Sequence, residues 1–217
     1  MSAPSMHPSD KSQLRRHFRS LRNSLSQTQQ IAASEQILAQ CHALTQYRDA
    51  NFVACYLAQD GEITLTPIIE DAWQNGKTVC LPVLHPFCKG HLIFVKYRHN
   101  SEMILNRFAI PEPKLNVADI VPISLLNIVF TPLVAFDESA QRLGMGGGFY
   151  DRTLAPMIRN EISPQVFGVA HDCQRVEEGL VNEEWDIPKS SPLHPSLTPR
   201  NPAHFCKLAT RRHCVLP

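Results

Sequence analysis

The chain has 217 residues, enough for one α/β domain with a substantial hydrophobic core. Its 21 lysine and arginine residues nearly balance 20 aspartate and glutamate residues, so the net charge does not favour a nucleic-acid or membrane partner. Neither a signal peptide nor an apolar run long enough to span a membrane is present in the sequence, and we therefore expect a cytoplasmic protein.

Two helices are predicted near the start of the chain. Between residues 11 and 25, apolar residues recur at the helical spacing while basic residues lie elsewhere, which predicts an amphipathic helix with a basic side. The apolar set is Leu14, Phe18, Leu21 and Leu25, and the basic set is Lys11, Arg15, Arg16, Arg19 and Arg22. A similar spacing predicts a second helix over residues 26–44.

Strands and helices then alternate along the chain. Apolar runs rich in strand-forming residues predict buried strands at 52–57, 78–83, 92–97, 128–136 and 165–170. Helices are predicted at 67–75, before Gly76, and at 149–159. This alternation predicts an α/β fold: a three-layer, mostly parallel, doubly wound sheet with helices on both faces.

Proline changes the character of the chain near its end. After Pro188, prolines recur at intervals that forbid a helix and interrupt a central strand. We therefore predict a flexible N-terminus over residues 1–10, one α/β domain over 11–188, and an atypical, irregular and disordered tail over 189–217.

Four of the nine glycines fall between residues 144 and 148, after a predicted strand and before a predicted helix. Glycine lets backbone N–H groups approach a ligand without a Cβ in the way, and the helix directs its positive dipole end to the same place. Arg142 before the loop offers a guanidinium for phosphate, and Asp151 after it offers a carboxylate for a divalent metal. The loop predicts a phosphate-binding site; a simple tight turn is the alternative.

Two common nucleotide-binding motifs do not fit this loop. No Gly-Lys-Ser or Gly-Lys-Thr follows at the spacing of a P-loop, and Phe149 occupies the third glycine position of the dinucleotide fingerprint. The predicted phosphate site is therefore neither a P-loop nor a dinucleotide-binding loop.

The residues around the loop resemble the signature of the 5-formyltetrahydrofolate cyclo-ligase family. The matching run is Leu133-Val-Ala-Phe-Asp137 followed by Arg142-Leu-Gly-Met-Gly-Gly-Gly-Phe-Tyr-Asp151. Weaker matches in the family's order are Lys11-x-x-Leu14-Arg15, Tyr56-Leu57 with Glu62, Phe108-Ala-Ile-Pro-Glu-Pro113 and Val181-Asn-Glu-Glu-Trp-Asp186. The resemblance covers roughly residues 11–188. It implies a three-layer α/β fold and an ATP- and Mg²⁺-dependent conversion of 5-formyltetrahydrofolate into 5,10-methenyltetrahydrofolate, ADP and phosphate.

The chemistry that the resemblance implies uses ATP to activate a poor electrophile. ATP would phosphorylate the formyl oxygen, N10 of the folate would attack the formyl carbon, and phosphate would leave as the ring closes. Such a transfer depends on positioning and charge neutralisation, so the site needs cations, backbone donors and a metal more than a nucleophile. The resemblance assigns catalysis to Arg142 and Tyr150.

The family's ATP-binding positions carry over to the first helix and the glycine loop. They are Lys11, Arg15, Arg142, Gly144, Met145, Gly146, Gly147, Gly148, Phe149 and Tyr150. Without the resemblance, Lys11 and Arg15 would be interpreted as part of a solvated basic face. Some members of the family carry lysine where this chain has Gly147, which bears on the cation that meets the γ-phosphate.

The resemblance also implies folate-binding and metal-binding residues. The folate set is Leu57, Glu62, Phe108 and Tyr150, and the Mg²⁺ ligands are Asp151 and Asp186. Glu62 would contact the formyl or pterin end, in the crevice where open α/β sheets bind ligands. The plain alternatives are a solvated loop residue for Glu62, a core aromatic for Phe108 and a surface carboxylate for Asp186.

After Asp186-Ile-Pro188 the chain departs from the family, whose final apolar strand is replaced by the proline-rich tail. The change indicates a shifted reading frame or a truncated domain with an unrelated extension. Two functions stay open: an active cyclo-ligase, and a non-catalytic folate- or nucleotide-binding protein, a decayed copy with a disrupted C-terminus. We expect 5-formyltetrahydrofolate and ATP as partners, no nucleic acid or membrane, and a monomer or weak dimer.

Overall fold

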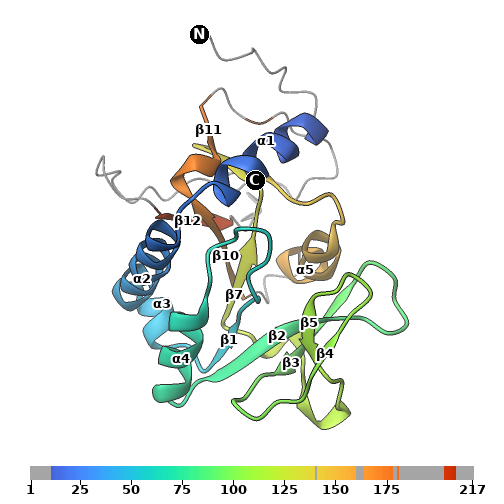
Figure 1. Ribbon diagram of the computed structural model, residues 1–217. Helices are drawn as coiled ribbons and strands as arrows, with labels where there is room; N and C mark the ends of the chain where they lie inside the picture. Colours follow the sequence, from blue (N-terminus) through green and yellow to red (C-terminus); the bar gives the residue numbers. More distant parts are fainter. Residues whose placement is uncertain (1–10, 140, 160–163, 178–179, 181–202, 209–217) are drawn as a thin grey trace, which may run out of the picture.

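A seven-stranded sheet forms the centre of the computed structural model, which describes residues 11–139, 141–159, 164–177, 180 and 203–208 (Figure 1). The strand order is β12-β10-β7-β1-β2-β3-β6. The bounds are β1 Phe52–Ala54, β2 Thr78–Leu84, β3 Leu92–Lys96, β6 Ile120–Val121, β7 Ile128–Pro132, β10 Gln165–His171 and β12 Ala203–Leu208. Two small sheets pair β4 Met103–Leu105 with β5 Pro111–Pro113, and β8 Ala135–Asp137 with β9 Arg142–Leu143 and β11 Arg175–Val176.

The large sheet is mixed rather than mostly parallel. Its four inner strands β10, β7, β1 and β2 run parallel, whereas β12, β3 and β6 pair with their neighbours antiparallel. Residues 85–91 join β2 to β3, and this connection is too short for the helical crossover that a parallel pair needs. The predicted strand at 128–136 also divides, into β7 and β8, which lie in different sheets.

Five α-helices are described: α1 Lys11–Asn23, α2 Gln27–Ala43, α3 Thr45–Arg48, α4 Thr66–Gln74 and α5 Phe149–Arg159. Alternate residues of the inner strands face different helices. Val53 in β1 belongs to the core cluster that includes Ile37 of α2 and Ile68 of α4, whereas the adjacent Ala54 packs with Leu154 of α5. The predicted α/β class is therefore confirmed, with helices on both faces of the sheet.

Helix α1 lies across the upper end of the sheet in Figure 1. Leu14 and Phe18 are buried on one of its faces, as predicted, and pack against Val134. Arg22 was expected on the basic side, but it is only 1% exposed because it follows Phe18 by four residues and lies on the same face.

Part of the tail is regular. Residues 189–217 are predicted to be irregular, yet Ala203–Leu208 form β12. This strand pairs antiparallel with residues 166–171 of β10. The prolines behind that expectation end at Pro202, so the backbone N–H groups of the following residues are free to enter a ladder. The rest of 189–217 lies outside the described residues. Among the described helices, none combines the length and apolar character that crossing a membrane requires.

Candidate active site

The predicted site residues gather at the carboxyl ends of the parallel strands. Glu62 lies on the loop after β1, and the glycine loop joins β9 to α5. Helix α1 crosses this edge, and Nη1 of Arg22 donates to the carbonyl of Leu133, the residue after β7, at 3.2 Å. This is the edge at which open α/β sheets bind their ligands.

The glycine loop leads directly into the first turn of α5. Gly148, the residue before the helix, has a φ of +61°, and a Cβ there would lie 2.7 Å from Nη1 of Arg152, so a larger residue would be both strained and crowded. Residues 144–147 are exposed. Nε of Arg15 donates to the carbonyl of Gly144 at 2.8 Å, which brings α1 onto the loop. Lys11, the first residue of α1, is partly exposed.

Arg142 and Asp151 form an ion pair that joins β9 to the first turn of α5. The Arg142 side chain is only 14% exposed, and its Nη1 atom is buried without a hydrogen-bond partner. An unpaired buried donor of this kind is costly unless a ligand satisfies it. The Asp151 side chain is 45% exposed, so this carboxylate remains open to solvent on the side away from the guanidinium.

Tyr150 and Glu62 interact electrostatically although they lie far apart in sequence. Burial, followed by the negative charge of Glu62, raises the pKa of Tyr150, whereas Arg142 lowers it. Burial also raises the pKa of Glu62, against the effects of a backbone hydrogen bond from Gln59 and of the Arg22 charge, whose Nη2 lies 3.8 Å from Oε1. The Glu62 side chain is 12% exposed, so it is not a solvated loop residue.

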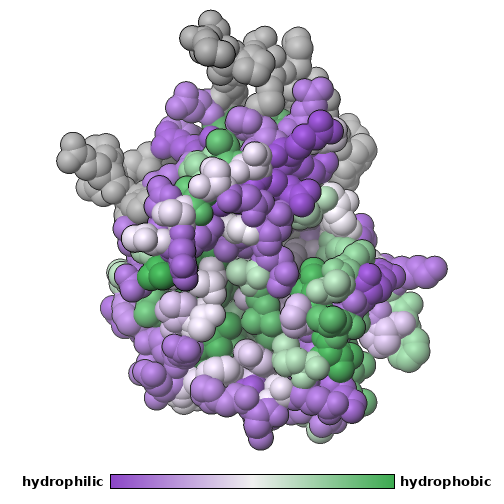
Figure 2. Space-filling model, in the orientation of Figure 1, coloured by the Kyte–Doolittle hydropathy of each residue, from purple (hydrophilic) through white to green (hydrophobic). Residues whose placement is uncertain are grey.

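Phe108 lies on the turn of the β4–β5 hairpin and is 52% exposed, so it is not an ordinary core aromatic. Its ring meets that of Phe149, the first residue of α5, edge-on at a centroid distance of 5.8 Å. Figure 2 shows apolar surface over this hairpin beside the polar surface of α1. Leu57 does not reach the loop in any described contact; it packs against the cluster of α2 and α4.

Comparison with known proteins identifies the family. A sequence profile described as the 5-formyltetrahydrofolate cyclo-ligase family matches residues 7–191. The chain belongs to this family. A 5-formyltetrahydrofolate cyclo-ligase of Escherichia coli (strain K12) is 48% identical over 179 residues, covering 82% of this chain and 97% of the relative. A 5-formyltetrahydrofolate cyclo-ligase of Haemophilus influenzae is 43% identical over 183 residues, covering 84% of this chain and 96% of the relative.

Solved structures agree with this cyclo-ligase assignment. The 5,10-methenyltetrahydrofolate synthetase of Aquifex aeolicus matches with a TM-score of 0.68 at 28% identity, covering 82% of this chain and 86% of that one. The 5,10-methenyltetrahydrofolate synthetase of Mycoplasma pneumoniae matches with a TM-score of 0.63 at 22% identity, covering 82% of this chain and 94% of that one. At this identity the match supports the fold alone.

The metal ligands predicted for this cyclo-ligase family member are only partly described. Asp186 lies outside the described residues, and within the described part of the chain no group of three or more His, Cys, Asp or Glu side chains is placed to hold a metal. Mg²⁺ commonly binds through one or two carboxylates together with substrate phosphates and water. Asp151, half exposed beside the glycine loop, fits such a site.

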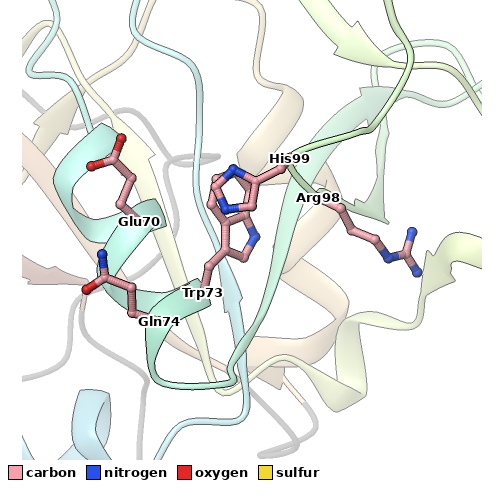
Figure 3. A pocket seen from close by; sticks show the side chains of 5 residues that line it. All are labelled: Glu70, Trp73, Gln74, Arg98 and His99. Carbon is pink, nitrogen blue, oxygen red and sulfur yellow. The ribbon is translucent and has the colours of Figure 1, made fainter.

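A hollow of about 500 Å³ lies elsewhere on this cyclo-ligase family member (Figure 3). Its lining residues are Glu70, Trp73, Gln74, Arg98 and His99. The ring of His99 lies on that of Trp73, with centroids 3.9 Å apart. These residues come from the end of α4 and the segment after β3, at the amino ends of the parallel strands, opposite the glycine loop. The hollow therefore does not belong to the candidate active site.

Two residues that support the site of this cyclo-ligase family member, Arg22 and Asp60, are not among those predicted from the sequence. The sequence pattern places Arg22 on the basic side of the first helix and gives Asp60 no role. Their signals were present: Arg22 continues the four-residue spacing of Leu14 and Phe18, and Asp60 precedes Gly61 in an Asp-Gly pair typical of tight turns.

Proposed function

We propose that this chain uses ATP and Mg²⁺ to cyclise 5-formyltetrahydrofolate to 5,10-methenyltetrahydrofolate, releasing ADP and phosphate. Membership of the cyclo-ligase family supports the folate substrate and the ring-forming reaction. The proposed phosphate chemistry rests on the side chains of this chain.

The observation that carries the proposal is the unpartnered Nη1 of Arg142. The atom is buried beside the glycine loop and the N-terminus of α5, where backbone N–H groups and the helix dipole favour an anion. Arg15 reaches the same loop from α1. Two guanidinium groups and the loop amides together suit a polyphosphate, and a phosphate oxygen would satisfy the open donor of Arg142.

Phosphoryl transfer followed by ring closure fits this arrangement. The formyl oxygen attacks the γ-phosphorus, the bond to ADP breaks, and Arg142 neutralises the charge that spreads over the transferred oxygens. N10 of the folate then attacks the activated formyl carbon, and its proton passes to the departing phosphate. The C–O bond breaks and phosphate leaves, which gives the methenyl ring.

The remaining residues would bind and orient the substrates. Glu62, on the loop after β1, would contact the formyl or pterin end of the folate, and Tyr150, whose hydroxyl is within electrostatic reach of both Glu62 and Arg142, would line the folate pocket. Phe108 and Phe149 form an aromatic pair at the edge of the loop on which a flat substrate ring would pack. Asp151, with Asp186 as second ligand, would hold Mg²⁺, which supplies charge neutralisation at the phosphates.

The reaction is tested by mixing the protein with 5-formyltetrahydrofolate, ATP and Mg²⁺ and following the absorbance of the methenyl product. We expect product only when all three are present. A folded protein that binds folate but gives no ATP-dependent product would instead be the non-catalytic binding protein.

Two substitutions test the assigned roles. Arg142→Ala should raise the KM for ATP roughly 10- to 150-fold, because a hydrogen bond to a charged group contributes about 1.5–3 kcal/mol. The turnover rate should fall as well, because Arg142 neutralises charge on the transferred oxygens. Arg98→Ala, which removes a guanidinium paired with Asp119 away from the loop, is the matched control and should leave KM unchanged. Asp151→Asn should increase the Mg²⁺ concentration needed for half-maximal rate; an unchanged Mg²⁺ dependence would contradict the metal role.

A further inference from the structure

A tight turn presents Glu62 to the candidate active site. Residues 59–62 are closed by a hydrogen bond from the N–H of Glu62 to the carbonyl of Gln59 at 2.9 Å. The central residues Asp60 and Gly61 have φ angles of 52° and 75°, the geometry of a type I′ turn. The Glu62 carboxylate accepts the N–H of Gln59 at 3.0 Å, so the position of its charge depends on the turn.

Three side chains from the last turns of α1 converge on Asp60. Its Oδ2 accepts Nε of Arg19 at 2.6 Å and Nη2 of Arg22 at 3.0 Å, and its Oδ1 accepts Nδ2 of Asn23 at 2.9 Å. Nε of Arg22 also donates to the backbone carbonyl of Asp60 at 2.7 Å. We refer to these four residues, Asp60, Arg19, Arg22 and Asn23, as the Asp60 cluster.

The Asp60 cluster is closely packed and charged. A Cβ on Gly61 would lie 2.7 Å from Oδ1 of Asn23 and 3.1 Å from the carbonyl of Arg22, so the turn sits directly against the end of the helix. Although partial burial raises it, hydrogen bonds from Arg19, Asn23 and Arg22 lower the pKa of Asp60 to about 2. The carboxylate therefore stays ionised near neutral pH.

The other end of α1 contacts the glycine loop through Arg15, whose Nε donates to the carbonyl of Gly144. Arg15 and Arg22 are seven residues apart, about two helical turns or roughly 10 Å. One short helix therefore contacts the loop expected to bind ATP and the turn that carries Glu62. A shift of α1 at either end changes the distance between the two.

We propose that Asp60 is a positioning residue, which holds the turn carrying Glu62 and the helix carrying Arg15 in one arrangement, so that the formyl group and the γ-phosphate meet. The role rests on the proposed function. Asp60 itself touches neither substrate; it acts through Glu62 on the folate side and through α1 on the ATP side.

Asp60→Asn is the informative substitution, because asparagine tolerates a positive φ in a type I′ turn and only the charge is lost. We expect the KM for 5-formyltetrahydrofolate to rise about tenfold and the KM for ATP several-fold, the scale of a charge-assisted hydrogen bond. Asp119→Asn is the matched control: Asp119 likewise accepts a bond from an arginine, Arg98, at 2.8 Å, but lies beside the edge strand β6. Its KM values should not change.

A double substitution separates positioning from general destabilisation. If Asp60 acts through Glu62, Asp60→Asn combined with Glu62→Gln should raise the folate KM no further than Glu62→Gln alone. Fully additive increases would overturn the proposal, because Asp60 would then act independently of Glu62.

Amide hydrogen exchange tests the same proposal without an activity measurement. Asp60→Asn should speed exchange both at 59–62 and at 144–148, and Asp119→Asn at neither. Faster exchange at 59–62 alone would overturn the connection through α1. If the unaltered protein formed no methenyl product while exchange rose in both segments, the proposed function would fall, whereas the connection that Asp60 makes between the two segments through α1 would stand.

Discussion

Replacing Gly90 by alanine is expected to weaken ATP binding, although Gly90 lies between β2 and β3 and not in the glycine loop. Nε of Arg152 donates to the carbonyl of Gly90 at 3.0 Å, and its Nη2 donates to the carbonyl of Gly147. A Cβ on Gly90 would lie 2.5 Å from Nη2 and 2.7 Å from Nε. The methyl group would therefore displace the guanidinium from both carbonyls.

The expected size follows from those two hydrogen bonds. Each bond connects an exposed guanidinium to a backbone carbonyl and contributes about 0.5–1 kcal/mol. Losing both therefore reduces the free energy that favours the ordered loop by roughly 1–2 kcal/mol. If that ordering is needed before phosphate binds, the KM for ATP rises roughly 5- to 30-fold. The turnover rate at saturating ATP should change little, because Arg152 orders the loop and does not touch the reacting atoms.

The assay is the KM for ATP at saturating 5-formyltetrahydrofolate, measured for Gly90→Ala, Arg152→Ala and the double variant. The double variant should behave like Arg152→Ala, since the alanine at position 90 acts only by displacing that side chain. Gly76→Ala controls for backbone strain: Gly76 has a φ of 69°, close to the 79° of Gly90, and no atom within 4 Å of its Cβ position. Additive effects in the double variant, or an equal rise in KM for Gly76→Ala, would refute the reasoning.

Three further predictions concern stability. Leu154→Ala should lower the free energy of unfolding by about 2–5 kcal/mol in urea, because the side chain is fully buried between α5 and the sheet; a loss below about 1 kcal/mol would contradict that packing. Tyr56→Phe should cost about 1–3 kcal/mol, since it leaves the buried carbonyl of Ile63 without its 2.9 Å hydrogen bond, and an unchanged midpoint would argue against this bond. Burial lowers the pKa of His171 from 6.5 to about 4, so the stability it contributes is complete above pH 6.5 and is lost as the pH falls towards 4. Between pH 7.5 and 5 this loss is about 2 kcal/mol, and His171→Gln should show a correspondingly flatter pH dependence of unfolding.

Local patterns were enough to predict four of the five described α-helices, all but the short α3, and the position of the glycine loop. The apolar spacing of Leu14 and Phe18 and the glycine after residue 75 act within one or two helical turns, so the sequence carries the signal directly. The ends of α1, α2, α4 and α5 accordingly lie within two residues of their predicted positions.

Contacts between distant segments could not be predicted in the same way. Arg22 is basic, which favours a solvated side chain, yet it is buried beside Asp60, a counter-charge 38 residues away that no local pattern reveals. The antiparallel direction of β3 likewise depends on the length of a connection and not on the composition of the strand. The cytoplasmic location, the partners beyond folate and the monomeric or weakly dimeric state stay predictions.

The pairing of β12 with β10 covers the backbone of β10 at one edge of the large sheet. Residues 166–171 of β10 are buried, and β7 pairs with residues 165–169 on the other side, so without β12 this strand would present unpaired N–H and C=O groups along an apolar border. Such a border is a template for joining chains into aggregates. A protein shortened to residue 191, where the match to the family ends, would retain the glycine loop and Glu62 yet is expected to precipitate on concentration. For this chain, the six residues of β12 that follow the proline-rich segment are therefore expected to keep the protein in solution.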